Sequence, residues 1–176
     1  MADSKSIQLE KYIRSIPDWP KQGILFRDIT PLLADAEAFA AAVDALCADF
    51  TNQNVDYVAA VEARGFIFGG AVAEKLGVGF VPIRKKGKLP FKTESITYDL
   101  EYGSDTLQVH CDAVAAGSRV LMIDDLLATG GTMAAACALT EKIGGSIAAI
   151  SFLIELTELG GREKLTNYKV LTCLSY

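Results

Sequence analysis

A single segment near the middle of the chain most constrains the fold. Four consecutive apolar residues, Val120 to Ile123, lead through two aspartates into a loop rich in glycine and threonine that ends at Thr132. Apolar residues then recur at helical spacing from Met133 to Ile143. This order predicts a buried strand, a tight loop and a helix, which is a building block of α/β folds.

The loop of this segment has the chemistry of an anion site. Gly130 and Gly131 allow close backbone approach to a ligand, and the neighbouring threonines add hydroxyl groups. The start of the following helix adds free N–H groups and the positive end of the helix dipole. Asp124 and Asp125 would repel a phosphate there, so we expect them to face hydroxyl groups or a metal ion. A phosphate beside hydroxyls describes a ribose phosphate, and the alternative is a loop whose aspartates only cap the helix.

Two other phosphate-binding motifs are absent from the sequence. The chain has no Gly-x-x-x-x-Gly-Lys-Ser/Thr segment, which a nucleoside triphosphatase would need beside its aspartate strand. It also lacks the Gly-x-Gly-x-x-Gly fingerprint of dinucleotide-binding folds. These absences leave the ribose-phosphate interpretation of the loop.

Length and charge limit the remaining function classes. A chain of 176 residues predicts one domain, and its net charge of −5 argues against a nucleic acid or an anionic membrane as partner. No apolar run approaches the roughly 20 residues of a membrane span, and the N-terminus has no apolar signal core. The four cysteines show no Cys-x-x-Cys spacing, so we expect reduced thiols in a cytoplasmic protein.

Periodic apolar patterns predict the other elements around this segment. Continuous apolar strands indicate a parallel sheet that is buried on both faces. A polar and apolar alternation interrupted by Gly103 predicts a hairpin that forms a mobile flap. The predicted helices are 4–16, 35–52, 66–76 and 133–143, the predicted strands are 23–26, 57–61, 80–83, 148–154 and 169–174, and the hairpin strands are 95–102 and 106–111.

Parallel strands bring unusual segments to one edge of the predicted sheet, because ligands bind at the carboxyl ends of such strands. The segments 62–65, 84–88, 124–132 and 155–159 all follow predicted strands. The segment 84–88 contains four cations in five residues, which suits a pyrophosphate. The alternative for this basic segment is a solvated loop.

The segment from Val120 to Thr132 resembles the phosphoribosyl pyrophosphate (PRPP) motif of the type I phosphoribosyltransferases, in the form found in the adenine-specific branch. The resemblance covers nearly the whole chain. It implies an α/β single domain with a central, mainly parallel sheet flanked by helices. It also implies a small base-binding hood at about residues 1–33 and a basic loop and flexible β-hairpin flap at about residues 84–111. The family further implies a homodimer.

The resemblance assigns the PRPP contacts to three segments. It implies that Asp124 and Asp125 contact the ribose hydroxyls and that the loop after them holds the 5'-phosphate. It gives the pyrophosphate to the cations, and it implies a cis peptide bond between Glu62 and Ala63. The residues implied for PRPP are Arg64, Arg84, Lys85, Lys88, Asp124, Asp125, Ala128, Thr129, Gly130, Gly131 and Thr132.

The resemblance also implies where adenine and the catalytic groups lie. Backbone groups of Leu25 and Arg27 would contact the purine edge, and Phe26 would lie beside the ring, although core packing is the simpler explanation for Phe26. In the segment 155–159, Leu156 would pack on adenine.

Glu101 is the implied catalytic acid or base, and Tyr102 would close over the site. The alternative for Glu101 is an exposed position on an alternating strand.

The implied reaction is a Mg²⁺-dependent transfer of the phosphoribosyl group from PRPP to N9 of adenine, yielding AMP and pyrophosphate. Mg²⁺ would arrive with PRPP, since no cage of carboxylates is visible in the sequence. One rival is an enzyme for hypoxanthine, guanine or xanthine, which would be expected to place a lysine near Glu155. The other is a PRPP-sensing regulator without catalysis, which the negative net charge disfavours.

Overall fold

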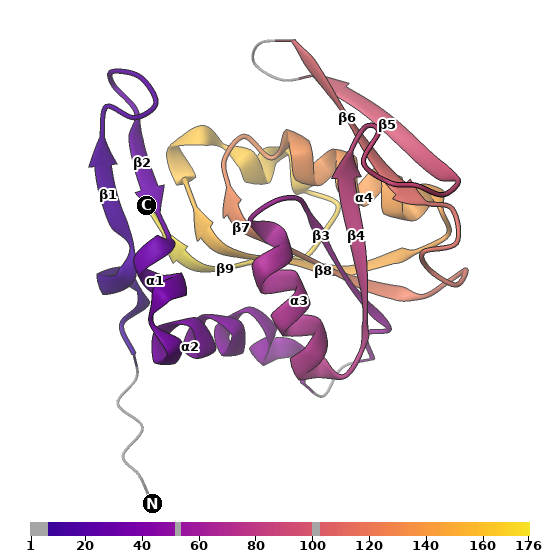
Figure 1. The fold of residues 1–176 in the computed structure, drawn as a ribbon, viewed down its shortest axis with the longest axis horizontal. Coiled ribbons are helices and arrows are strands. Elements are labelled where there is room, and N and C mark those ends of the chain that lie inside the picture. The colour runs from indigo at the N-terminus through magenta and orange to yellow at the C-terminus, as the bar shows by residue number, and fades with distance from the viewer. Residues whose placement is uncertain (1–6, 52–53, 100–102) are drawn as a thin grey trace, which may run out of the picture. The chain divides into compact units, whose positions relative to one another are not determined.

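The computed structural model describes residues 7–51, 54–99 and 103–176 (Figure 1). The chain forms two compact units, of which the first ends at Ala45 and the second begins at Leu46. The boundary falls within helix α2 (Ala36–Cys47), so the first unit extends beyond the predicted hood of about residues 1–33. Within the described ranges, no helix has the length and apolar character needed to cross a membrane.

The first unit is built on a two-stranded antiparallel sheet. Its elements are the 3-10 turn η1 (Leu9–Tyr12), the strands β1 (Arg14–Pro17) and β2 (Leu25–Asp28), the helix α1 (Thr30–Ala34) and most of α2. Asp28 lies just before the N-cap residue of α1, and its carboxylate accepts hydrogen bonds from the Thr30 N–H at 2.9 Å and the Thr30 hydroxyl at 2.8 Å. The strand predicted at 23–26 is observed as β2 at Leu25–Asp28, two residues later in the chain.

The helix predicted over residues 4–16 is wrong within the described residues. A single 3-10 turn covers Leu9 to Tyr12, and the chain is extended from Arg14. Pro17 disfavours helical backbone at the residue before it, and Arg14 to Pro17 instead pair in register with β2. Sheet pairing therefore overrides the helical spacing of the apolar residues.

The second unit contains a seven-stranded sheet in the order β5-β6-β4-β3-β7-β8-β9 (Figure 1). The strands are β3 (Tyr57–Val61), β4 (Gly79–Lys85), β5 (Thr93–Asp99), β6 (Ser104–His110), β7 (Arg119–Leu127), β8 (Ser146–Glu155) and β9 (Val170–Ser175). The five strands from β4 to β9 in this order are parallel, which confirms the predicted sheet. The hairpin β5–β6 continues the sheet, because β6 pairs antiparallel with β4.

Helices cover both faces of this sheet. These helices are α3 (Gly65–Leu76) and α4 (Gly131–Lys142). The second unit also contains the 3-10 turns η2 (Ala48–Phe50), η3 (Thr157–Leu159) and η4 (Gly161–Leu165). Gly69 of α3 lies against Ala60 of β3, whereas the neighbouring Ala59 belongs to the apolar core that α4 covers. Successive strand residues point to opposite faces, so α3 and α4 lie on opposite faces of the sheet.

Candidate active site

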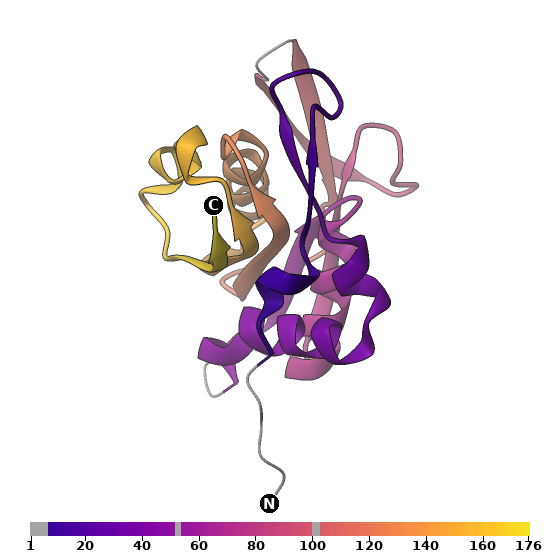
Figure 2. The same ribbon diagram turned by 90° about the vertical axis from the view of Figure 1, so that its left-hand side faces the viewer.

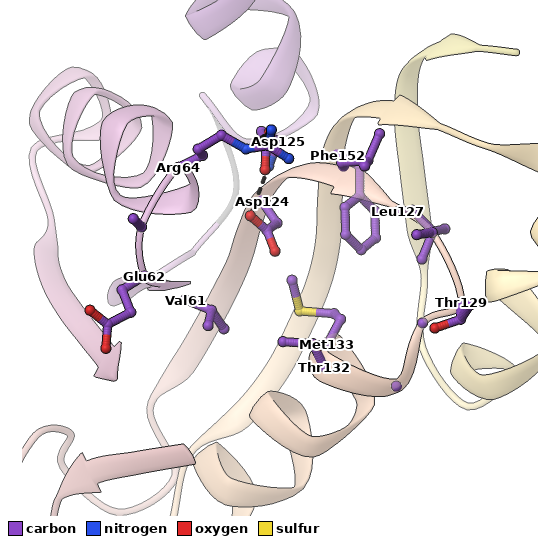
Figure 3. A pocket seen from close by; sticks show the side chains of 15 residues that line it. Val61, Glu62, Arg64, Asp124, Asp125, Leu127, Thr129, Thr132, Met133 and Phe152 are labelled. Atoms are coloured by element: carbon purple, nitrogen blue, oxygen red, sulfur yellow. Dashed lines mark hydrogen bonds and ion pairs between the residues drawn. The ribbon is translucent and has the colours of Figure 1, made fainter. Parts of the chain in front are cut away.

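A cavity of about 260 Å³ lies at the carboxyl ends of β3 and β7 (Figure 3). Its walls come from residues 61–64 at and after the end of β3, from residues 124–133, which run from the end of β7 into α4, and from Phe152 on β8. All of these residues belong to the second unit. Two of the four segments that the sequence places at this edge therefore form one pocket.

The two aspartates of the pocket differ in their surroundings. Asp125 is 5% exposed, and its Oδ2 forms an ion pair of 2.8 Å with the Nε of Arg64. Asp124 points into the pocket, and its Oδ1 accepts a hydrogen bond of 2.9 Å from the Asp125 N–H (Figure 3). A carboxylate aimed into the pocket is an acceptor for ligand hydroxyls.

Burial is the main influence on the titration of this pair. Burial and the neighbouring charge of Asp125 raise the pKa of Asp124 well above its ordinary value. Burial also raises the pKa of Asp125, although the Arg64 guanidinium opposes this shift. Gly65 permits the close approach, because a Cβ atom there would lie 2.7 Å from Oδ1 of Asp124. The fold therefore keeps a carboxylate in the pocket against the cost of desolvation.

The loop after β7 leads directly into α4 and leaves the start of that helix open. Gly130 has the N-cap position with φ of 76°, a left-handed conformation that favours glycine. Because this residue has no side chain, the N–H groups of the first turn of α4 meet no capping side chain there. The helix begins at Gly131 rather than at the predicted Met133, so Thr132 belongs to its first turn.

The predicted cations of the basic segment converge on carboxylates. Oε2 of Glu62 lies 3.1 Å from Nη2 of Arg84 and 3.0 Å from Nζ of Lys88. The Lys85 N–H donates to Oε1 of Glu62 at 2.7 Å, and the Lys85 ammonium pairs with Asp105 at 3.1 Å. Glu62 lines the pocket, whereas the three cations are not among the residues that line it.

The sequence analysis placed Glu62 at this edge of the sheet but proposed no role for its side chain or for Asp105. The missing information was strand register, because the pairing of Val61 with Ile83 places Glu62 beside Arg84. Burial raises the pKa of Glu62, but hydrogen bonds from Lys85, Lys88 and Arg84 outweigh burial and lower it overall. The peptide bond between Glu62 and Ala63 is cis, as predicted.

The lowered pKa of Glu62 predicts a pH-dependent contribution to stability. A carboxylate with a lowered folded pKa stabilises the fold above its unfolded value, and this contribution is lost as pH falls through the folded pKa. We expect Glu62→Gln to lower the melting temperature at pH 7 by about 3 °C, since the partly exposed pairs contribute about 1 kcal/mol. Thermal denaturation at pH 7 and pH 3 measures this effect. A difference as large at pH 3 as at pH 7 would contradict the assignment.

The predicted adenine contacts are divided between the two units. Leu25, Phe26 and Arg27 lie on β2 of the first unit, where the Phe26 ring packs edge-on against Trp19 with centroids 4.4 Å apart. Leu156 follows β8 in the second unit, and its N–H donates to the carbonyl of Leu127 at 2.9 Å. Trp19 is an aromatic neighbour that the sequence analysis did not consider.

The predicted catalytic residues Glu101 and Tyr102 lie outside the described residues. The strand before them reaches the pocket loop, because the Tyr98 hydroxyl lies 3.2 Å from the Thr132 hydroxyl. Glu155, in the fourth predicted segment, is buried and receives two hydrogen bonds from Arg162, at 2.7 and 2.8 Å. Its carboxylate therefore links the end of β8 to Arg162 in the C-terminal part of the chain.

Comparison with known proteins identifies relatives along nearly the whole chain. A family model described as phosphoribosyl transferase domain matches residues 32–175. Adenine phosphoribosyltransferase of Parvibaculum lavamentivorans is 56% identical over 97% of this chain and 98% of its own length. The corresponding protein of Pseudothermotoga lettingae is 52% identical over 97% of this chain and 100% of its own length.

Solved structures agree with these relatives. The structure of adenine phosphoribosyltransferase from Thermoanaerobacter pseudethanolicus has a TM-score of 0.92 and 51% identity, and the match covers 96% of this chain and 98% of that one. The Saccharomyces cerevisiae structure, in complex with D-2,5-dideoxy-2,5-imino-altritol 1,6-bisphosphate and adenine, has a TM-score of 0.90 and 41% identity. That match covers 96% of this chain and 97% of the yeast chain.

Proposed function

This chain belongs to the phosphoribosyl transferase family, and we propose that the pocket at the carboxyl ends of β3 and β7 is where it binds PRPP. The chain transfers the phosphoribosyl group of PRPP to N9 of adenine and yields AMP and pyrophosphate. The observation behind the pocket assignment is the close placement of Asp124 and the open start of α4 in one cavity.

Ribose recognition is assigned to the acidic pair. Asp124 points into the pocket and accepts hydrogen bonds from the ribose hydroxyls, while Arg64 holds Asp125 in place behind it. Ribose C1' becomes electron-poor as the bond to pyrophosphate breaks. Two carboxylates beside the ribose stabilise that developing positive charge electrostatically.

Phosphate recognition is assigned to the loop and to the first turn of α4. The 5'-phosphate accepts hydrogen bonds from the N–H groups of this turn and from the hydroxyls of Thr129 and Thr132. Ala128, Gly130 and Gly131 carry no bulky side chain, so the phosphate approaches the backbone closely. The loop thereby fixes one end of PRPP while C1' reacts at the other.

The pyrophosphate is assigned to Arg64 and to the basic segment of Arg84, Lys85 and Lys88. These three cations form ion pairs with Glu62 and Asp105, which keep them together at the end of β4. A pyrophosphate carries more charge than one carboxylate and offers more acceptor oxygens, so it competes with Glu62 for the cations. The departing group is stabilised by charges that the fold has already gathered.

Adenine is assigned to Leu25, Phe26 and Arg27 of β2 and to Leu156 after β8. N9 of adenine forms a bond to C1' as the bond from C1' to pyrophosphate breaks, and the N9 proton leaves. Glu101 is assigned to this proton transfer and Tyr102 to closing the site, although both lie outside the described residues.

A Mg²⁺ ion fits this pocket as a companion of PRPP rather than as a resident of the protein. Arg64 already pairs with Asp125, and Arg84 and Lys88 pair with Glu62, so the pocket offers chiefly the Asp124 carboxylate. Mg²⁺ prefers phosphate oxygens and water. When bound, the ion neutralises charge on the pyrophosphate. We further assign the chain to the cytoplasm, since its four cysteines carry free thiols, as in a reducing compartment. The homodimer that the family resemblance implies is part of the same proposal.

Conversion of adenine to AMP by the purified protein tests this function. We expect turnover with adenine and PRPP in the presence of Mg²⁺, and loss of turnover when EDTA removes the ion. Hypoxanthine and guanine, assayed in parallel, should give little product. Comparable turnover of guanine would refute the adenine assignment, and full activity in EDTA would refute the role of Mg²⁺.

A further inference from the structure

The C-terminal turn η4 lies directly behind the loop assigned to the 5'-phosphate. The two views show η4, in yellow, beside the start of α4, in orange (Figures 1 and 2). A Cβ atom on Gly130 would collide with the carbonyl of Gly161, and a Cβ atom on Gly161 would collide with the carbonyl of Ala128. The two backbones are therefore in contact, which fixes η4 against the loop.

An ion pair between the half-exposed Arg162 and the buried Glu155 holds η4 in this position. Arg162 donates two hydrogen bonds to Glu155 at the end of β8, at 2.7 and 2.8 Å. The same guanidinium donates to the Val170 carbonyl and to the Thr172 hydroxyl of β9, both at 3.1 Å. Arg162 thus ties η4 to two strands, and the residues that follow it have a defined place.

Lys164, two residues later, places its ammonium group over the start of α4. A Cβ atom built on Gly131 would lie 3.7 Å from the Nζ of Lys164. In the described part of the chain, this ammonium forms no ion pair, whereas Arg64, Arg84 and Lys88 each pair with a carboxylate.

A lysine at this end of a helix is unfavourable by itself. The N-terminus of α4 has the positive end of the helix dipole, so a second positive charge nearby is repelled. An anion between the ammonium and the N–H groups would turn this repulsion into two attractions. The position of Lys164 is therefore explained by a phosphate bound at the start of α4.

We propose that Lys164 binds the 5'-phosphate of PRPP and of AMP, together with the first turn of α4. This role rests on the proposed phosphate loop and adds a charged contact from a different element. Lysine binds phosphate as a point charge, so the contact favours ligands that carry the 5'-phosphate. It assigns a substrate contact to η4, a turn for which the sequence analysis proposed no function.

Binding of AMP and of pyrophosphate to Lys164→Gln tests the proposal. We expect the dissociation constant for AMP to rise about tenfold, since a charge-assisted hydrogen bond is lost at an exposed site. Pyrophosphate has no 5'-phosphate, so its binding should stay unchanged. In the steady state, KM for PRPP should rise more than kcat falls in Lys164→Gln. The conservative variant Lys164→Arg should bind AMP about as tightly as the wild type.

Lys169→Gln is the matched control. Lys169 lies between η4 and β9, but its ammonium pairs with Asp49 at 3.3 Å. Unchanged AMP binding in Lys164→Gln, or equal weakening of pyrophosphate, would overturn the proposal. Thr132→Val separates the assignment of the 5'-phosphate to the loop from the proposal for Lys164. If it weakens AMP binding while Lys164→Gln does not, the loop assignment stands and Lys164 has no role. If neither variant weakens AMP binding, the loop assignment fails as well.

Discussion

Asp124→Asn is expected to stabilise the fold and to weaken PRPP binding in the same molecule. Burial and the charge of Asp125 disfavour the ionised form of Asp124, which is why its pKa is raised. Asparagine has nearly the same shape and can still accept the hydrogen bond from the Asp125 N–H. It removes the buried charge but also the charged acceptor assigned to the ribose hydroxyls.

The sign of the stability effect follows from the direction of the shift. A carboxyl group with a raised folded pKa destabilises the fold as pH rises from its unfolded value through its folded one. We therefore expect Asp124→Asn to melt above the wild type at pH 8, with the difference disappearing toward pH 4. Thermal denaturation without PRPP across this range measures it.

The binding effect has the opposite sign. Loss of a charge-assisted hydrogen bond to ribose should weaken PRPP binding by on the order of tenfold to a hundredfold, as measured by calorimetry at pH 8. Asp112→Asn removes the same charge from an exposed position and should change neither quantity. A variant that is more stable and binds PRPP as tightly as the wild type would refute the ribose assignment.

The sequence was most informative at the segment that contains Asp124. The run from Val120 to Thr132 contains both its structural pattern and its chemistry within one stretch, so the strand, loop and helix could be predicted together. The crossover from β3 through α3 to β4 was predictable for the same reason, since each element has its own apolar period. Local patterns are sufficient where an element and its function are contiguous.

Contacts between distant segments could not be predicted in this way. Glu62 gathers Arg84 and Lys88 because β3 and β4 are in register, and Gly161 supports Gly130 because η4 returns to the loop. Neither contact leaves a periodic signal in the sequence. The strand β1 shows the converse, because helical spacing was present there and pairing with β2 decided the structure. Tertiary pairing therefore accounts for both the omissions and the error.

The hairpin β5–β6 lies at the edge of the sheet, and it is the element assigned to proton transfer. Its strand β5 is tied to α4 in two places, at the first turn and at the last residue of the helix. The Tyr98 hydroxyl lies 3.2 Å from the Thr132 hydroxyl, and Lys142 pairs with Glu94 at 2.7 Å. The end of β5 that precedes Glu101 in the sequence is thus held beside the first turn of α4, to which the 5'-phosphate is assigned.

Glu101→Ala is expected to lower kcat by about a hundredfold or more while changing PRPP binding less than about twofold, because general acid–base catalysis typically contributes factors of 10² to 10⁴. The proton of N9 has to leave during the transfer, whereas binding of PRPP is assigned to the loop, the aspartates and the cations. Single-turnover kinetics and PRPP titration measure the two quantities separately. Glu94→Ala removes a carboxylate from the same hairpin and should leave kcat within about twofold. Equal losses in turnover and PRPP affinity for Glu101→Ala would show that Glu101 positions PRPP instead of moving the proton.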